Sequence, residues 1–283
     1  MKGRRGIGLE RLRLMICVAS LCGPIGAAAQ VPVQMEKDVI YGRTDGAALL
    51  ADIAYPVEGR GLPAIMYVHG GRWISGERNS DGGLHVTEWA GMGYFAMTVD
   101  FRLAGSSPAP AAYQDVQTAI RWVHAHAEQY GVDPDRIYLI GNSSGGHLVS
   151  LAATLGEGPY ERVGGWRDSR ADIRGAISVS GAYDLNALSW GDLWKPMDGD
   201  PVQARRLASP IDHVGPNTKP ILLIHSDDDR AVPIQQAIDM AAALDSAGVH
   251  FRFVHLADRG HMSLTDEVKN LAAAFISEIE EGD

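Results

Sequence analysis

The fold is indicated most clearly by one stretch of sequence, Arg136-Ile-Tyr-Leu-Ile140-Gly-Asn-Ser-Ser-Gly-Gly-His147. Its first part is an apolar run bounded by glycine, which is typical of a strand that is buried on both faces. Its second part leads into a helical pattern over 143–155 and places Gly141 and Gly145 on either side of Ser143, in the order G-x-S-x-G. Such a strand-to-helix turn strains its serine and needs small residues where neighbouring backbone approaches. The pattern predicts that Ser143 is a nucleophile at the N-terminus of a helix.

The same alternation of short apolar runs and longer helical patterns extends along the rest of the chain. Further buried strands are expected over 64–68, 94–99, 176–180, 221–224 and 251–255. Further helices are expected over 111–130, 233–247 and 263–280. Strands that alternate with helices indicate an α/β fold, in which helices cover both faces of a mostly parallel sheet. Two apolar runs, Val39–Tyr41 and Ala48–Tyr55, flank Asp45-Gly46, so the N-terminal strands are expected to form an antiparallel hairpin.

Composition and spacing indicate one catalytic domain over residues 30–283. Hydrophobic residues make up 46% of the 283 residues, and neither an internal repeat nor a linker interrupts them. The segment 184–220 is irregular and rich in proline, and we expect it to form a small cap-like insertion in which Trp190 and Trp194 offer aromatic faces to substrate. The net charge of −10 argues against nucleic acid as a partner.

Residues 1–29 have the pattern of a secretory signal peptide. Basic residues precede a short apolar run, Leu14–Cys22, and small residues end at Ala29. The apolar run is too short for a membrane span, and the bulky Leu21 disfavours a lipoprotein cleavage site at Cys22. We therefore expect a secreted or periplasmic protein without a membrane span. Both cysteines of the chain lie in this segment, so the rest can hold neither a disulfide nor a Cys-ligated metal.

A second chemical signal follows the expected strand 64–68. The string His69-Gly70-Gly71-Arg72-Trp73 stands where a strand-to-helix loop can offer backbone N–H groups to a tetrahedral oxyanion. The glycines let the chain pass within hydrogen-bonding distance of a substrate carbonyl. We expect the donors to be the amides of Gly71 and Arg72, together with the amide of Ser144 next to the nucleophile.

A serine nucleophile on such a sheet needs an acid and then a base further along the chain. The base is expected to be His261, which follows the strand 251–255. The acid is one of Asp227, Asp228 and Asp229, since successive loop residues point in different directions; we prefer Asp229. This acidic run lacks the spacing of an EF-hand, and His124-Ala-His126 lies within a helix at a spacing that points the two rings apart. Neither a metal nor another cofactor is expected.

These motifs together resemble those of the α/β-hydrolases, in the esterase/lipase group related to hormone-sensitive lipase and its acetyl-xylan and feruloyl esterase-like (BD-FAE-like) branch. The resemblance runs from about Ala48 to Ile279. It is carried by His69-Gly-Gly-Arg-Trp73, Asp100-Phe-Arg-Leu-Ala104, Gly141-Asn-Ser-Ser-Gly-Gly146, Ala208-Ser-Pro210, His225-Ser-Asp-Asp-Asp-Arg-Ala-Val-Pro233 and Gly260-His261. In the family the acid lies four residues before the proline of a D-x-x-V-P run, which corresponds to Asp229 and Pro233.

The resemblance implies a serine carboxylester hydrolase that cleaves small or carbohydrate-linked acetyl or feruloyl esters through an acyl-enzyme. Two positions depart from the family pattern: Arg72 replaces a frequent glycine, and Asn142 replaces a frequent aspartate. The guanidinium of Arg72 could favour an anionic group of the substrate or point to solvent. The H-G-G-x-W string also resembles that of aryl formamidases, which are the alternative among enzymes. The alternative of another class is a non-catalytic binding protein on the same fold.

Overall fold

The computed structural model describes residues 31–282, and these fall within one compact unit. The signal peptide expected at residues 1–29, and the export that it implies, lie outside the described residues. Within residues 31–282 no helix combines the length and the apolar character that crossing a membrane requires.

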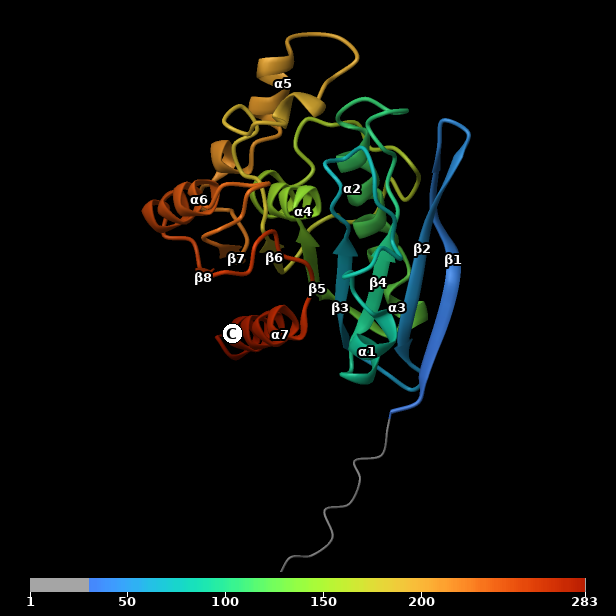
Figure 1. The fold of residues 1–283 in the computed structure, drawn as a ribbon. Coiled ribbons are helices and arrows are strands. Elements are labelled where there is room, and N and C mark those ends of the chain that lie inside the picture. The colour runs from blue at the N-terminus through green and yellow to red at the C-terminus, as the bar shows by residue number, and fades with distance from the viewer. Residues whose placement is uncertain (1–30, 283) are drawn as a thin grey trace, which may run out of the picture. The chain divides into compact units, whose positions relative to one another are not determined.

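The described residues form an eight-stranded sheet, in the order β1-β2-β4-β3-β5-β6-β7-β8 (Figure 1). Its strands are β1 (Val33–Thr44), β2 (Ala47–Pro56), β3 (Leu62–Val68), β4 (Phe95–Val99), β5 (Val132–Asn142), β6 (Gly175–Val179), β7 (Ile221–Ser226) and β8 (Phe251–Leu256). Strand β2 is antiparallel to β1 and to β4, and the other neighbours are parallel. The turn between β1 and β2 has positive φ at Asp45 and Gly46, as a tight hairpin requires. The expected α/β fold with an antiparallel N-terminal hairpin is therefore confirmed.

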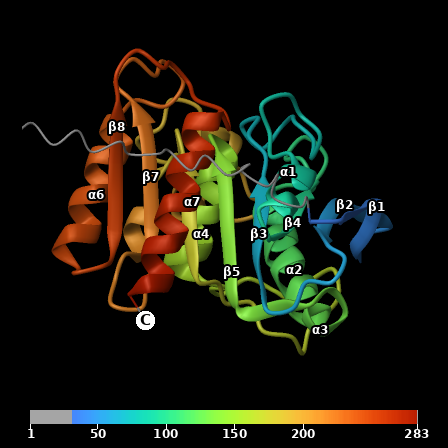
Figure 2. The same cartoon turned by 90° about the horizontal axis from the view of Figure 1, so that it is seen from below.

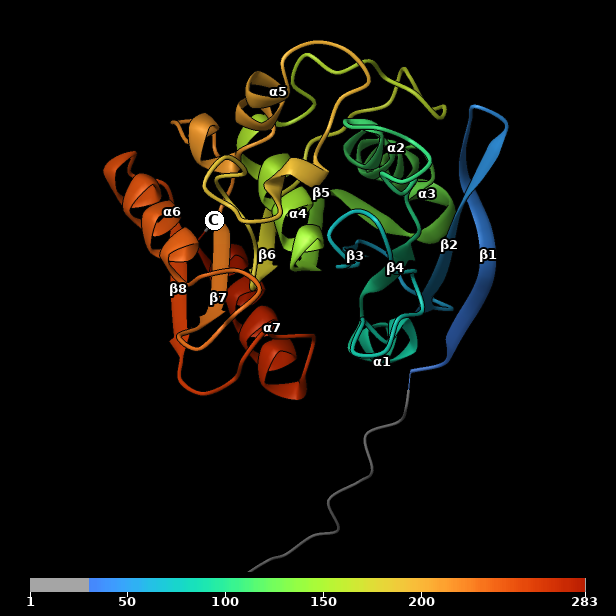
Figure 3. The same cartoon turned by 45° about the horizontal axis from the view of Figure 1, so that its top comes forward.

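Helices cover both faces of this sheet (Figure 2 and Figure 3). They are α1 (Val86–Gly91), α2 (Ala111–Ala125), α3 (Ala127–Tyr130), α4 (Ser144–Leu155), α5 (Pro201–Leu207), α6 (Gln235–Ser246) and α7 (Asp266–Glu281), with 3-10 turns η1 (Gly191–Leu193) and η2 (Pro210–His213). One core cluster packs α2, α4 and α6 against the sheet, and the other packs α1 and α7 against the opposite face. The apolar character of the central strands on both sides follows from this arrangement.

The helix that the sequence predicts over 111–130 is divided in the structure. Helix α2 ends at Ala125, and α3 begins at Ala127 after His126 leaves helical geometry. The Nδ1 atom of His126 lies 2.8 Å from the carbonyl oxygen of Trp122. The same carbonyl also accepts from the backbone amide of His126 at 3.1 Å, so the side chain adds a second donor to the last turn of α2.

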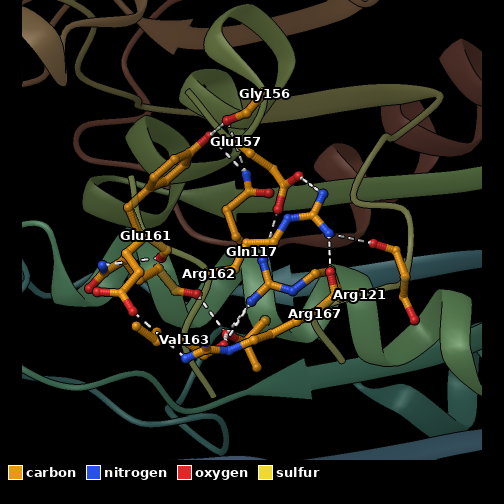
Figure 4. Close-up of polar contacts among 12 residues, drawn as sticks. Gln117, Arg121, Gly156, Glu157, Glu161, Arg162, Val163 and Arg167 are labelled. Atoms are coloured by element: carbon orange, nitrogen blue, oxygen red, sulfur yellow. Dashed lines mark hydrogen bonds and ion pairs between the residues drawn. The ribbon is translucent and has the colours of Figure 1, made fainter. Parts of the chain in front are cut away.

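The connection between α4 and β6, residues 156–174, has no helix or strand and is fastened to α2 by polar side chains (Figure 4). Arg121 of α2 is 1% exposed and donates to Glu157 Oε1 at 2.9 Å and to the carbonyl of Val163 at 2.8 Å. Gln117 donates to the carbonyl of Gly156 at 3.3 Å. These bonds satisfy carbonyls that a long connection would otherwise leave without partners.

The irregular segment 184–220 contains η1, α5 and η2, and α5 lies at the end of the sheet toward which β3 points (Figure 1). Its two tryptophans, Trp190 and Trp194, have different surroundings. Trp194 is 2% exposed and its ring packs against Trp73 and His147, with centroids 5.3 Å away in both cases. The expectation that Trp194 offers a face to substrate is therefore wrong, because this side chain fills the core beneath the segment. Trp190 is buried too, but it borders the cleft described below.

Candidate active site

Ser143 stands between β5 and α4 with φ 55° and ψ −122°, a conformation that residues other than glycine rarely adopt. Its amide donates to the carbonyl of Val179 in β6 at 2.8 Å, which helps to fix the turn. A Cβ atom on Gly145 would lie 2.0 Å from the carbonyl oxygen of Val68, and one on Gly141 would lie 2.5 Å from the backbone of Gly145. The glycines of the G-x-S-x-G pattern are therefore required by backbone contact on both sides of the serine.

Ser143 opens into a cleft of about 690 Å³ that is also lined by His261, Gly71 and Arg72. These residues come from three different loops, which follow β3, β5 and β8 at their carboxyl ends. Sites in open α/β sheets collect at this edge. The fold thus brings to one cleft the serine and histidine of the predicted triad and two of the residues predicted to stabilise an oxyanion.

His261 is held by a buried carboxylate. Its Nδ1 lies 2.8 Å from Asp229 Oδ2, and the Asp229 side chain is 0% exposed. The other oxygen, Oδ1, accepts from the amides of Ala231 and Val232 at 2.9 and 3.0 Å. Burial alone would raise the pKa of Asp229, but the hydrogen bonds from His261 and from these amides hold its pKa below the usual value. An ionised Asp229 accepts a hydrogen bond from the N–H group at Nδ1 of His261, which leaves Nε2 of the ring able to take up a proton.

The other two aspartates of the run contact the loop that carries His261. Asp227 Oδ1 accepts from the amide of Asp258 at 3.1 Å. Asp228 Oδ1 accepts from the amide of Gly260 at 2.7 Å. Both Asp258 and Gly260 have positive φ, which is unfavourable at Asp258 but not at glycine, so these bonds hold a loop with one strained residue in place. Of the three consecutive aspartates, only the preferred one, Asp229, reaches the imidazole.

Ser226, the last residue of β7, extends this arrangement. Its hydroxyl donates to Asp228 Oδ1 at 2.7 Å and accepts from the amide of Arg259 at 2.9 Å. The hydrogen bonds from Ser226 and Gly260 lower the pKa of Asp228. From the sequence, Ser226 is not a predicted site residue, and Asp227 and Asp228 are predicted only as alternatives to Asp229 for the acid. The signal was present in the unbroken acidic run, but the partners become visible only when the loops after β7 and β8 are side by side.

The loop after β3 has the geometry expected of an oxyanion-binding loop. Gly71 has φ 115°, and a Cβ there would lie 2.1 Å from the carbonyl oxygen of Ser75, so only glycine fits. The amides of Gly71, Arg72 and Ser144 donate to no acceptor within residues 31–282. Gly71 and Arg72 line the cleft, whereas Ser144 is buried directly beside the nucleophile. The amides of Gly71 and Arg72 therefore remain available to a substrate oxygen in the cleft, and the role of the Ser144 amide stays a prediction.

Asn142 connects this loop to the nucleophile turn. Its Oδ1 accepts from the amide of Gly70 at 3.1 Å and from the hydroxyl of Tyr67 at 2.9 Å. An aspartate would offer the same acceptor oxygen, so the departure from the family pattern at this position retains its structural role.

Arg72 and Trp73 both have positive φ, at 55° and 61°, which is unfavourable for these residue types. The side chain of Trp73 anchors the loop in this conformation. Its amide lies 3.3 Å from Ser144 Oγ, and its indole Nε1 donates to His147 Nδ1 at 3.2 Å. His147 in turn donates from Nε2 to the carbonyl of Ala208 at 2.7 Å. Burial lowers the pKa of His147 to about 4, which keeps the ring neutral in the tautomer that these two bonds require. The fully buried indole thus holds two strained residues in place.

The buried, neutral His147 predicts a pH-dependent stability. The unfolded chain binds a proton at His147 below its ordinary pKa of 6.5, whereas the folded chain does so only near pH 4. The contribution to stability is therefore complete above pH 6.5 and is lost as the pH falls toward 4. At pH 5 we expect a loss of about 2 kcal/mol from this residue. His69 and His225 are also buried with lowered pKa values and contribute in the same direction.

The measurement is urea unfolding at pH 7 and pH 5 for the parent chain and for His147→Gln, whose amide can accept from one side and donate to the other. The variant is expected to lose about 2 kcal/mol less between the two pH values. An equal loss in both proteins would contradict the prediction.

The family model described as BD-FAE matches residues 51–244. Among curated proteins of Mycobacterium tuberculosis, the esterase LipQ is 31% identical over 75% of this chain and 53% of its own length. The probable carboxylic ester hydrolase LipM is 29% identical over 62% of this chain and 43% of its own length. This chain thus spans about half the length of these relatives.

Solved structures resemble the whole of the described fold. A truncated form of a carbohydrate esterase from gut microbiota superposes with a TM-score of 0.75, at 24% identity, over 89% of this chain and 99% of that chain. Est2, a thermophilic esterase of Thermogutta terrifontis with butyrate bound, superposes with a TM-score of 0.72, at 24% identity, over 89% of this chain and 95% of that chain.

Proposed function

Because the chain belongs to the BD-FAE family of α/β-hydrolases, we propose that it is a serine carboxylester hydrolase. The observation that carries the proposal is the 2.8 Å contact between Asp229 and His261, at a cleft into which the strained Ser143 also opens. The nucleophile, the base and the acid occur in the chain order that this fold uses.

In the proposed mechanism Ser143 attacks the carbonyl carbon of the ester while His261 Nε2 accepts the proton of the hydroxyl. Asp229 keeps the other imidazole proton on Nδ1 and stabilises the imidazolium that forms. The amides of Gly71, Arg72 and Ser144 bind the oxyanion of the tetrahedral intermediate. His261 then protonates the leaving alcohol, and water attacks the acyl-enzyme by the same sequence to release the acid.

The lining of the cleft favours small or carbohydrate-linked esters. Polar side chains such as Tyr67, Ser80, Asn142 and Ser189 line it, and Trp190 offers its only indole. Hydroxyl and amide groups suit the many hydroxyls of a sugar, and an aromatic face suits a sugar or phenolic ring. Apart from the ring of Tyr67, only Trp190 and Ala231 among the lining residues have hydrophobic side chains, so a long alkyl chain would contact few of them. The bound butyrate of the Thermogutta esterase and the carbohydrate esterase from gut microbiota are further support for this substrate class.

A series of 4-nitrophenyl esters from acetate to decanoate tests this proposal. We expect kcat/KM to be highest for the two to four carbon acyl groups and to fall roughly tenfold or more by decanoate, because the added methylenes gain no apolar contact. Acetylated xylan and methyl ferulate are assayed beside them, with release of at least one acid expected. Fastest turnover of decanoate would contradict the substrate class. Turnover of N-formylkynurenine with no ester cleaved would favour the aryl formamidase alternative instead.

A further inference from the structure

Two arginines border the cleft from different loops. Arg72 belongs to the loop after β3, and Arg230 directly follows Asp229 in the loop after β7. Both residues are exposed, and both line the same cleft as Ser143 and His261. The backbone of Arg72 is fixed in left-handed geometry by the buried Trp73, so the origin of its side chain has a defined position.

Neither guanidinium has a carboxylate within ion-pair distance among residues 31–282. The contrast with Arg78, a few residues from Arg72, is clear: it forms ion pairs with Asp38, Asp52 and Asp100. Exposed arginines elsewhere in the described part of the chain, such as Arg60, also lack an ion pair, but Arg72 and Arg230 are the two that line the cleft, where a substrate group can reach them.

The acidic groups at the cleft do not balance these two charges. Asp81 is the carboxylate among the lining residues, and it can offset one arginine at most. The side chain of Asp229 is fully buried and is bound by His261 and by two amides. Asp228 interacts electrostatically with Arg230, but it does not line the cleft. Among the side chains that line the cleft, two arginines therefore stand against one carboxylate.

We infer that this cleft selects esters that carry a carboxylate near the scissile bond, and that Arg72 and Arg230 determine this specificity. The inference rests on the proposed esterase function and adds the charge of the substrate to it. A guanidinium presents parallel N–H donors that match the two oxygens of a carboxylate, and the bond is strengthened where the cleft excludes water. A uronic acid would combine this carboxylate with the hydroxyls that the polar lining suits.

Two matched substrate pairs test the inference. They also show whether the arginines bind a carboxylate on the alcohol side or on the acyl side of the ester. On the alcohol side, 4-acetoxybenzoate is compared with its methyl ester; on the acyl side, mono-4-nitrophenyl adipate is compared with methyl 4-nitrophenyl adipate. We expect kcat/KM to be about tenfold higher for the anionic member of at least one pair, and this ratio to decline with added salt. Arg72→Gln and Arg230→Gln are each expected to lower the ratio about tenfold.

The matched control is Arg60→Gln, an exposed arginine that does not line the cleft and should leave the ratio unchanged. Equal turnover of both members by the parent chain, or a ratio unaffected by Arg72→Gln and Arg230→Gln, would overturn the inference and leave the esterase function intact. If the parent chain turned over neither ester and a fluorophosphonate failed to label Ser143, the proposed function would be wrong. In that case the binding of glutarate, measured by calorimetry, would test the inference. If the parent chain and the variant with both Arg72→Gln and Arg230→Gln bound glutarate with equal affinity, the inference would be rejected.

Discussion

Replacing Ser143 with alanine is expected to lower kcat/KM for 4-nitrophenyl acetate by roughly 10⁴-fold or more, because no other group can form the acyl-enzyme. The folded structure should persist, since alanine removes one oxygen and keeps the backbone of a turn fixed by Val179 and by the close approach of Gly145 to Val68. Steady-state kinetics and labelling with a fluorophosphonate measure the loss, and a thermal unfolding curve checks the fold.

The neighbouring Ser144 provides the control for this variant. Its hydroxyl accepts from the amide of Trp73 at 3.3 Å, so Ser144→Ala loosens the anchor of the loop after β3. We expect an effect of about tenfold, with Ser143 still labelled. If labelling survived in Ser143→Ala and vanished in Ser144→Ala, the nucleophile would be Ser144 and the assignment of Ser143 would be wrong.

Much of the fold could be predicted because its signals are local. The apolar runs that become β3 to β7 are buried by helices on both faces, so their composition alone marks them as strands. The expectation of a buried strand over 251–255 is wrong, because β8 is the edge strand of the sheet and its residues are only partly buried or exposed. The Asp45-Gly46 turn marks the hairpin in the same way. The short helices α1 and α5 could not be predicted, because one or two turns give too little periodicity. Nor could the break at His126, because neither proline nor glycine marks it in the sequence.

Residue type and chain order predict Ser143 and His261 as site residues, and the structure brings both of them to one cleft. The sequence could not show that Trp194 packs beneath the loop instead of facing the cleft, because both tryptophans lie in an irregular segment without periodicity. It also could not show that Trp73 and His147 form one hydrogen-bonded unit, since 74 positions separate them along the chain. Contacts of this kind follow from the parallel pairing of β3 with β5, which brings the two loops together.

Asparagine in place of Asp229 is expected to lower kcat/KM by roughly 10³-fold to 10⁴-fold, the size of effect that this change has in a serine protease triad. An amide at this position no longer carries the charge that stabilises the imidazolium, and it can turn its NH₂ group toward His261 and impose the wrong tautomer. Steady-state kinetics give the loss. Proton NMR gives an independent measurement. In the parent chain Nδ1 of His261 lies 2.8 Å from Asp229 Oδ2, and the downfield resonance of the proton in this hydrogen bond should be lost in the variant.

Two variants of Asp228 separate the effect of its charge from the effect of its hydrogen bonds on the position of His261. Asp228→Asn keeps an oxygen that can accept from Gly260 and Ser226, so most of the activity should remain; Asp228→Ala loses both bonds and should lower kcat about tenfold with little change in KM. This follows because Gly260 precedes His261 in a loop with two positive-φ residues, and a small shift there moves the imidazole away from Ser143. If Asp228→Asn lowered activity as much as Asp229→Asn, the charge of Asp228 would matter more than its hydrogen bonds. Asp228 would then share or take over the catalytic role assigned to Asp229, and its assignment as a positioning residue would be wrong.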